Sequence, residues 1–263
     1  MISASDEAPR CSDRSSGGSS SLYDRIVLDL LAVGDVLLDV LLPDRPERHV
    51  EVVVRAGGAA VNAARTARRL GATAAVAGRV GDDAPGHGIA RELERLGIDA
   101  LLTFDPDRPT GTAVYRGGEI FAADRGANEA AAFEWLPAAR ATLVSAYLPR
   151  AAVQSALRSA SGLRALDLQG ISSESDGADV VLGPGLDLQA FGHVGVVCAT
   201  HADEGAEARR GDEWARSAPP TILPGPIPGA GDAFAAGFLL ALLRQEPLAD
   251  ALAAGCAAVT SEA

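Results

Sequence analysis

The chain has 263 residues, of which 48% are hydrophobic, and a formal net charge of −12 at pH 7. This length and composition are enough for one large domain with a full core. The negative charge disfavours binding to nucleic acid or to an anionic membrane surface. All 23 basic residues are arginine, which excludes, in their usual forms, enzymes that need an active-site lysine: P-loop enzymes, Schiff-base aldolases and pyridoxal enzymes.

Residues 1–24 are polar and rich in serine, which predicts a disordered tail without a secretory signal. Three cysteines without paired spacing and four histidines without metal-ligand spacing indicate neither a disulfide framework nor a zinc site. Such cysteine usage is typical of a reducing cytosol, so we expect a cytoplasmic protein.

The first hundred residues alternate between apolar strands and helical segments. A buried strand at 26–33 continues as an extended stretch at Val36–Leu42, and a β-branched strand follows at Val50–Val54. The next elements expected are a helix at Ala59–Leu70, a strand at Ala74–Gly78 and a helix at Gly86–Leu96. Strand and helix alternating at this spacing predict parallel βαβ units.

Residues 100–123 interrupt this alternation. Thr110–Tyr115 and Glu119–Ala123 flank a glycine-rich turn, which predicts a β-hairpin. Together with Val50–Val54, this hairpin is expected to form a small separate sheet. We therefore predict one domain over residues 25–263, with lid segments near 42–56 and 103–127.

The α/β alternation resumes after Asn128. Strands are expected at Thr142–Ala146, Arg164–Leu168, Asp179–Leu182 and Gly195–Ala199. Helices are expected at Arg150–Ala160, at Asp232–Arg244 and from Pro247 onward.

The most informative segment is Pro228–Asp232, which precedes the apolar run Ala233–Leu243. That run is long enough for a buried helix and too short to span a bilayer. Glycines at the start of a helix let the backbone approach a ligand, and the free N–H groups there attract an anion such as a phosphoryl group. We predict an anion hole at Gly229, Ala230 and Gly231, with Asp232 as the base that takes a hydroxyl proton. The alternative is an ordinary loop with Asp232 as a helix N-cap.

Two motifs, in order, resemble those of the ribokinase-like sugar kinases of the phosphofructokinase-B type. The first is the double glycine Gly57–Gly58 with Asn62 and a helix ending at Leu70–Gly71, and it is followed by Gly78–Asp83. The second is Gly229–Asp232, about 170 residues later. The resemblance covers nearly the whole chain from Ile26. It implies an α/β three-layer sandwich with a mostly parallel central sheet, helices on both faces and a small β lid.

The resemblance also implies roles for individual residues. Candidate substrate-binding residues are Asp35, Asp39, Gly57, Gly58, Asn62 and Asn128, and candidate nucleotide-binding residues are Thr200, Ala202 and Gly205. ATP and Mg²⁺ are the implied cosubstrate and cofactor, and a homodimer through the lid is a further expectation. Three of these residues have an alternative, purely structural role: Asp39 as a turn residue, Asn62 as a helix N-cap and Thr200 as a strand-end hydroxyl.

Several positions depart from the family pattern. Pro226–Ile227 replaces an Asp-Thr pair whose aspartate helps to hold a monovalent cation, so dependence on K⁺ is doubtful. The Asn-x-x-Glu linked to magnesium falls at Pro184–Asp187, which leaves Asp187 as the candidate metal ligand. Ala202 replaces a glycine, and the end of the sequence at Ala263 suggests weakened adenine contacts.

We expect a carbohydrate kinase that transfers phosphate from ATP to a primary hydroxyl of a sugar or sugar-like molecule. The alternative is a catalytically weakened sugar or nucleoside binding protein on the same fold. A Rossmann dehydrogenase is disfavoured, because no Gly-x-Gly-x-x-Gly follows the first strand. Ala59 lies at the position where ribokinase usually has lysine, which makes ribose a less favoured substrate without excluding it. Nucleosides, fructose and 2-keto-3-deoxygluconate remain candidate substrates.

Overall fold

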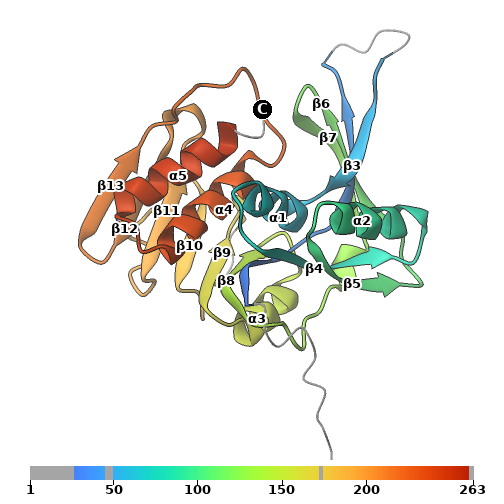
Figure 1. The fold of residues 1–263 in the computed structure, drawn as a ribbon, viewed down its shortest axis with the longest axis horizontal. Helices are drawn as coiled ribbons and strands as arrows, with labels where there is room; N and C mark the ends of the chain where they lie inside the picture. The colour runs from blue at the N-terminus through green and yellow to red at the C-terminus, as the bar shows by residue number, and fades with distance from the viewer. Residues whose placement is uncertain (1–26, 45–49, 172–173, 261–263) are drawn as a thin grey trace, which may run out of the picture.

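The computed structural model describes residues 27–44, 50–171 and 174–260, so the tail expected over residues 1–24 lies outside the described residues (Figure 1). Its largest element is a nine-stranded sheet with the strand order β13-β12-β11-β10-β9-β8-β1-β4-β5. The strands are β1 (Leu28–Val33), β4 (Ala74–Gly81), β5 (Asp99–Asp105), β8 (Ala139–Ser145), β9 (Leu163–Asp167), β10 (Val180–Pro184), β11 (Val196–Thr200), β12 (Ala206–Arg210) and β13 (Glu213–Ser217).

The strands from β5 to β11 in this order are all parallel, and only β12 and β13 at one edge run antiparallel. The parallel strands consist largely of buried apolar residues, as expected for strands covered on both faces. Their carboxyl ends meet at one edge of the sheet, which is where ligands bind in open α/β folds.

Helices cover both faces of this sheet (Figure 1). On one face lie α1 (Ala59–Arg69), α2 (Ala84–Arg95), α4 (Ala230–Leu243) and α5 (Leu248–Thr260). The other face is covered by α3 (Arg150–Ser159) together with loop residues such as Phe133 and Leu188. The resulting three-layer α/β architecture, with helices on both faces of a mostly parallel sheet, confirms the predicted fold class.

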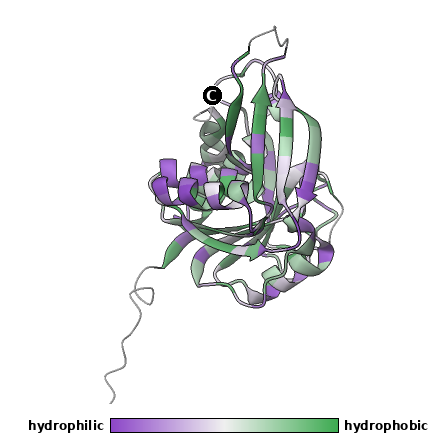
Figure 2. Ribbon diagram, turned by 90° about the vertical axis from the view of Figure 1, so that its right-hand side faces the viewer, coloured by the Kyte–Doolittle hydropathy of each residue, from purple (hydrophilic) through white to green (hydrophobic). Residues whose placement is uncertain are grey.

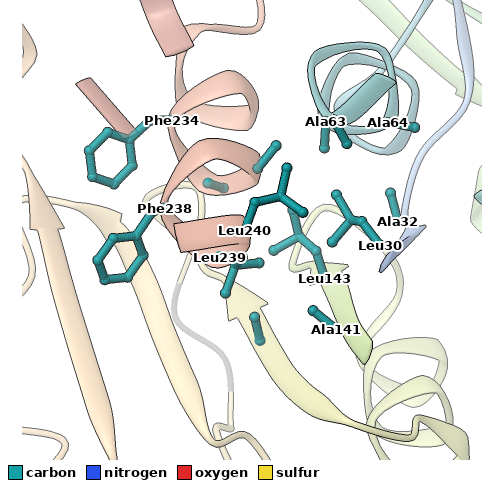
Figure 3. Packing of buried hydrophobic residues seen from close by; sticks show 14 of the residues in the cluster. Leu30, Ala32, Ala63, Ala64, Ala141, Leu143, Phe234, Phe238, Leu239 and Leu240 are labelled. Atoms are coloured by element: carbon teal, nitrogen blue, oxygen red, sulfur yellow. The ribbon is translucent and has the colours of Figure 1, made fainter. Parts of the chain in front are cut away.

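Helix α4 lies at the centre of the first layer. It is apolar all round, as expected for a helix that is buried on every side. Phe234 and Phe238 stack at 5.8 Å between ring centroids, and Leu240 packs toward Leu30 and Leu143 of the sheet (Figure 3). This packing fixes the position of the amino terminus of α4 relative to the sheet.

A second, four-stranded sheet has the order β3-β2-β6-β7 and stands beside the main sheet (Figures 1 and 2). Its strands are β2 (Leu37–Leu42), β3 (Val53–Gly57), β6 (Thr110–Arg116) and β7 (Glu119–Gly126). The hairpin expected around Arg116–Gly118 is present as β6 and β7. Figure 2 shows that hydrophobic stretches run along several of its strands.

The boundaries of several elements differ from the sequence-based expectation. Strand β3 begins at Val53 and continues to Gly57, because its register is set by pairing with β2, where Val40 faces Val54. Residues 99–105 form β5 of the main sheet, so the second segment of the small sheet begins at Thr110 rather than near residue 103. The edge hairpin of β12 and β13 was not expected at all.

Among the described residues, no helix combines the length and apolar character needed to cross a lipid bilayer.

Candidate active site

The amino terminus of α4 is built by a glycine in the left-handed region. Gly229 has φ 89° and is the N-cap residue, and no side chain caps the helix. A Cβ on Gly229 would lie 2.8 Å from Nδ2 of Asn62, so any other residue would collide with α1. The N–H of Ala230 donates to the carbonyl oxygen of Ile227 at 3.1 Å. The following N–H groups of the first turn have no intrahelical acceptor, which is the arrangement that attracts an anion.

Asp232 lies in this first turn and is buried. Its Oδ2 accepts a hydrogen bond from Asn62 Nδ2 of α1 at 3.0 Å, and its Oδ1 accepts one from Gln169 Nε2 at 2.9 Å. The carboxylate therefore bonds to two side chains and does not cap its own helix, so the N-cap alternative for Asp232 is wrong. Asn62 is not a cap either, because Gly58 is the N-cap residue of α1.

A second buried carboxyl group, Asp167, lies at the carboxyl end of β9. Its Oδ2 accepts from Gln169 Nε2 at 2.6 Å, so one amide joins Asp167 to Asp232. Burial raises the pKa of Asp167 to about 7. Burial also raises the pKa of Asp232 well above its usual value, and the charge of Asp167 raises it further. The two carboxyl groups thus behave as a coupled pair.

Asp39 on β2 is fully buried, and within the described residues neither of its oxygens has a hydrogen-bond partner. Burial raises the pKa of Asp39 to about 6, against the opposing fields of Arg55 and Arg65. Gly57 lies two residues beyond Arg55, the residue paired with Asp39, on the adjacent strand β3, and a Cβ on Gly57 would overlap the Asp39 carboxylate. A buried carboxylate without a partner is costly, and it is the kind of acceptor that substrate hydroxyls satisfy.

The other predicted substrate-binding residues are engaged with the backbone. Asp35 accepts from the N–H of Ala59 at 3.4 Å, and a Cβ on Gly58 would overlap the Asp35 carbonyl oxygen. The Asn128 amide exchanges hydrogen bonds with Val36 N (2.9 Å) and O (3.0 Å) and donates to Arg125 O at 2.9 Å. Asn128 therefore joins the β1–β2 connection to the end of β7. Its contact with a substrate stays a prediction.

A pocket of about 590 Å³ opens beside the amino terminus of α4. It is bounded by three segments: the turn after β11, the loop before α4, and α4 with α5. All three predicted nucleotide-binding residues line it together with two residues of the predicted anion hole, namely Thr200, Ala202, Gly205, Ala230 and Gly231. The pocket is thus continuous with the helix terminus that would bind a phosphoryl group.

The turn between β11 and β12 uses two residues with positive φ. Ala202 has φ 48°, a conformation that costs a residue with a Cβ about 1–2 kcal/mol. A glycine, which the resemblance stated above places at this position, would avoid this cost. Gly205 has φ 93°, and a Cβ there would overlap the carbonyl oxygen of Ser217.

Asp187 lies in an exposed turn after β10, where its Oδ1 accepts from the N–H of Gln189 at 2.9 Å. Within the described parts of the chain, no group of three or more His, Cys, Asp or Glu side chains could hold a metal ion. The assignment of Asp187 as a metal ligand stays a prediction.

The structure thus brings Asp232, Asn62 and the Gly229–Gly231 segment together. Sequence reasoning missed four further residues at this site: Asp167, Gln169, Tyr115 and Tyr147. Burial raises the pKa of both tyrosines, and the nearby charges of Asp232 and Asp35 raise it further. Asp167 and Gln169 could have been found from their place at the carboxyl end of a buried parallel strand.

Known structures share this architecture. Adenosine kinase from Sinorhizobium meliloti matches with a TM-score of 0.77 and 20% identity, covering 89% of this chain and 93% of that one. Ribokinase from Thermotoga maritima matches with a TM-score of 0.75 and 19% identity, covering 89% and 93%. Arabidopsis thaliana ribokinase, solved with ribose and ATP, matches with a TM-score of 0.69 and 20% identity, covering 89% and 92%. The fold is therefore ribokinase-like.

The model of the pfkB family of carbohydrate kinases matches residues 27–172 and 165–261. The chain belongs to the pfkB carbohydrate kinase family. No curated protein sequence matches it significantly.

Proposed function

We propose that the protein transfers the γ-phosphoryl group of ATP to a primary hydroxyl of a sugar or nucleoside. The observation that carries this proposal is the position of Asp232. It lies in the first turn of α4, beside two residues that line the large pocket, Ala230 and Gly231, and it is hydrogen bonded to Asn62 on the other side. A base placed between an anion-binding helix terminus and a second polar site is what phosphoryl transfer to a hydroxyl requires.

The acceptor would bind between the small sheet and the main sheet. Asp39 supplies two oxygens that have no partner among the described residues, and the missing Cβ of Gly57 leaves the space that this carboxylate occupies. Vicinal hydroxyl groups of a sugar ring would donate to these oxygens, and Asn62 would orient the reacting hydroxyl toward Asp232. Asp35, Gly58 and Asn128 complete the set of proposed substrate-binding residues.

ATP would bind in the 590 Å³ pocket, with its phosphates at Gly229–Gly231. The volume is within the range of small-molecule sites, and the pocket includes the residues proposed for the nucleotide, Thr200, Ala202 and Gly205. The solved ribokinases of the same fold include complexes with ribose and ATP and with ADP, which supports the same ligands here. Mg²⁺ would bridge the phosphates, since it is commonly held by phosphate oxygens with one or two carboxylates. Asp187 is the candidate carboxylate.

We further propose that the small sheet is a lid over this site. The tip of the β6–β7 hairpin already packs on the loop that precedes the anion hole, because a Cβ on Gly118 would overlap the carbonyl oxygen of Pro226. A closed lid excludes water, which would otherwise accept the phosphoryl group. The exposed apolar residues of the small sheet and its border would allow a homodimer through the lid, namely Val52, Val53, Val54, Ile120 and Phe121.

One observation favours a second candidate, a binding protein with weakened catalysis. Pro226 and Ile227 line the nucleotide pocket without side-chain oxygens, and Ala202 lies in a strained turn of the same pocket. These changes are on the nucleotide side, whereas the acceptor side keeps its buried aspartate. Such a protein would bind the sugar or nucleoside and form no ADP.

The two candidates are separated by a coupled ADP-release screen across a panel of sugars and nucleosides with Mg²⁺ and ATP. The kinase proposal predicts acceptor-dependent ADP formation that is lost in Asp232→Asn. Binding of one panel member by calorimetry without any ADP formation would support the binding protein instead.

A further inference from the structure

Gln169 adopts a backbone conformation that its residue type disfavours. It follows β9 with φ 50°, one of three described residues other than glycine with positive φ, beside Ala202 and Gln245. This left-handed region costs such a residue about 1–2 kcal/mol. The cost is tolerated where surrounding contacts hold the residue in place, and such residues cluster at functional sites.

The hydrogen bonds that Gln169 donates within the described residues go to two carboxyl groups. Its backbone N–H donates to Asp167 Oδ1 at 3.2 Å, and its Nε2 donates to Asp167 Oδ2 at 2.6 Å and to Asp232 Oδ1 at 2.9 Å. The Nε2 atom carries two hydrogens, so it makes both side-chain bonds at once. Asp167 therefore holds Gln169 at two points, and the remaining hydrogen of the amide is directed at Asp232.

The Asp232 carboxylate is in turn held from two directions. Asn62 donates to Oδ2 from α1, and Gln169 donates to Oδ1 from the carboxyl end of β9. One amide on each oxygen fixes the plane of the carboxylate and leaves the remaining lone pairs for an incoming hydroxyl. A single amide would leave the group free to rotate about its Cβ–Cγ bond.

We propose that Gln169 is a positioning residue, locked by Asp167, that orients the Asp232 carboxylate toward the acceptor hydroxyl. This inference rests on the proposed function, in which Asp232 is the base. Gln169 touches neither the acceptor nor the nucleotide in this role. It acts through the two carboxyl groups that it joins.

Gln169 and Asp167 act on the proton affinity of Asp232 in opposite directions. The hydrogen bond from Gln169 stabilises the ionised form and lowers the pKa of Asp232, whereas the charge of Asp167 raises it. The other polar or ionisable groups around Asp232 are Asn62 of α1, Asp35 of the β1–β2 connection, Tyr115 of β6 and Tyr147 after β8. Of these four, Tyr147 also lies in the field of Asp167, so Asp167→Asn changes two charges' surroundings at once, whereas Gln169→Gly removes a hydrogen bond and no charge.

The test compares Gln169→Gly, Asp167→Asn and the control Gln245→Gly. Glycine keeps the left-handed backbone accessible at both glutamine positions, and Gln245 is an exposed residue with φ 59° beyond the end of α4. The carboxyl carbon of Asp232, assigned with Asp232→Asn, is titrated by ¹³C NMR in each full-length variant. Removing the hydrogen bond is expected to raise the titration midpoint by about one pH unit.

Removing the Asp167 charge is expected to lower the midpoint, and Gln245→Gly is expected to leave it unchanged. In the ADP-release assay, Gln169→Gly should lower kcat about tenfold with both KM values within about twofold of wild type, because orientation of a base acts in the transition state. Midpoints that coincide in all variants, or that move in the same direction in Gln169→Gly and Asp167→Asn, overturn the proposal. The titration needs no turnover, so a wild-type protein without kinase activity would contradict the proposed function and leave this test intact.

Discussion

Asn62 Nδ2 lies 3.0 Å from Asp232 Oδ2, so the first long helix of the chain is hydrogen bonded to the first turn of α4, 170 residues later. Arg65 Nη1 lies 3.4 Å from Asn62 Oδ1, which orients the amide so that its nitrogen faces the carboxylate. Residues from both of the sequence motifs therefore meet at one carboxyl group. This contact explains why the double-glycine motif and the Gly-Ala-Gly-Asp motif are informative as a pair.

Asp39→Asn is expected to stabilise the ligand-free protein at pH 7 by about 2–3 kcal/mol. The pKa of Asp39 in the native state, about 6, is above the reference value of 3.8. Ionisation of Asp39 therefore lowers the free energy of unfolding. The native state binds more protons than the unfolded state between about pH 4 and pH 6, so this cost grows as pH rises through that window. Thermal melts at pH 4.5 and pH 7 should show the full gain of Asp39→Asn at pH 7 and about a third of it at pH 4.5. A destabilised Asp39→Asn at pH 7 would contradict the unpartnered state of this carboxylate.

The same Asp39→Asn substitution is expected to raise KM for the acceptor about tenfold or more and to change KM for ATP less than about twofold. A carboxylate that accepts substrate hydroxyls contributes about 1.5–3 kcal/mol per charged hydrogen bond, whereas the nucleotide pocket is lined by other residues. Initial-rate kinetics with each substrate varied in turn measure both constants. Equal effects on the two KM values would place Asp39 in the scaffold.

Gly118→Ala is expected to lower kcat/KM for the acceptor about tenfold and to increase ATP hydrolysis without acceptor. The added Cβ would overlap the carbonyl oxygen of Pro226 and hold the hairpin tip away from the loop before the anion hole, which admits water. Gly211→Ala is the matched control, since Gly211 also has a positive φ in a hairpin turn, 60° against 87° for Gly118, and a Cβ there meets nothing within 4 Å. If both variants lose the same activity, backbone strain rather than lid contact is responsible.

We expect activity to change less than about twofold between matched K⁺ and tetramethylammonium buffers. Pro226 and Ile227 offer no side-chain oxygen beside the anion hole, and backbone carbonyls alone hold a cation weakly without a fixed negative charge. The measurement is the initial rate at constant ionic strength. Strong stimulation by K⁺ would mean that its ligands come from elsewhere in the chain.

The parallel part of the main sheet, apart from its edge strand β5, could be predicted from the sequence because most strands there are short apolar runs. The β12–β13 hairpin could not be predicted from the sequence, because its strands, Ala206–Arg210 and Glu213–Ser217, bury only one face. Their pairing is set by β11, with Cys198 opposite Ala208, and by the turn at Gly211. Tertiary pairing of this kind overrides weak local preference.

The candidate base could also be predicted, because glycine, a helix start and a carboxylate form a local pattern. The strand end marks Asp167 and Gln169 as site candidates, but their contact with Asp232 could not be predicted, because they are 63 to 65 positions away in sequence and the glutamine depends on an unusual backbone conformation. For Asn128 the motif predicts substrate contact, which stays a prediction, and it gives no sign of the backbone bonds that the amide makes to Val36 and Arg125.

The most direct measurement is acceptor-dependent ADP formation by wild type and Asp232→Asn, with Asp99→Asn as an exposed carboxylate control. Asp232 is buried at the helix terminus, so its role as base predicts a loss of kcat of about 10²–10⁴-fold with little change in either KM, while Asp99→Asn stays at the wild-type rate. If Asp232→Asn retained a tenth or more of the wild-type rate, Asp232 would not be the base.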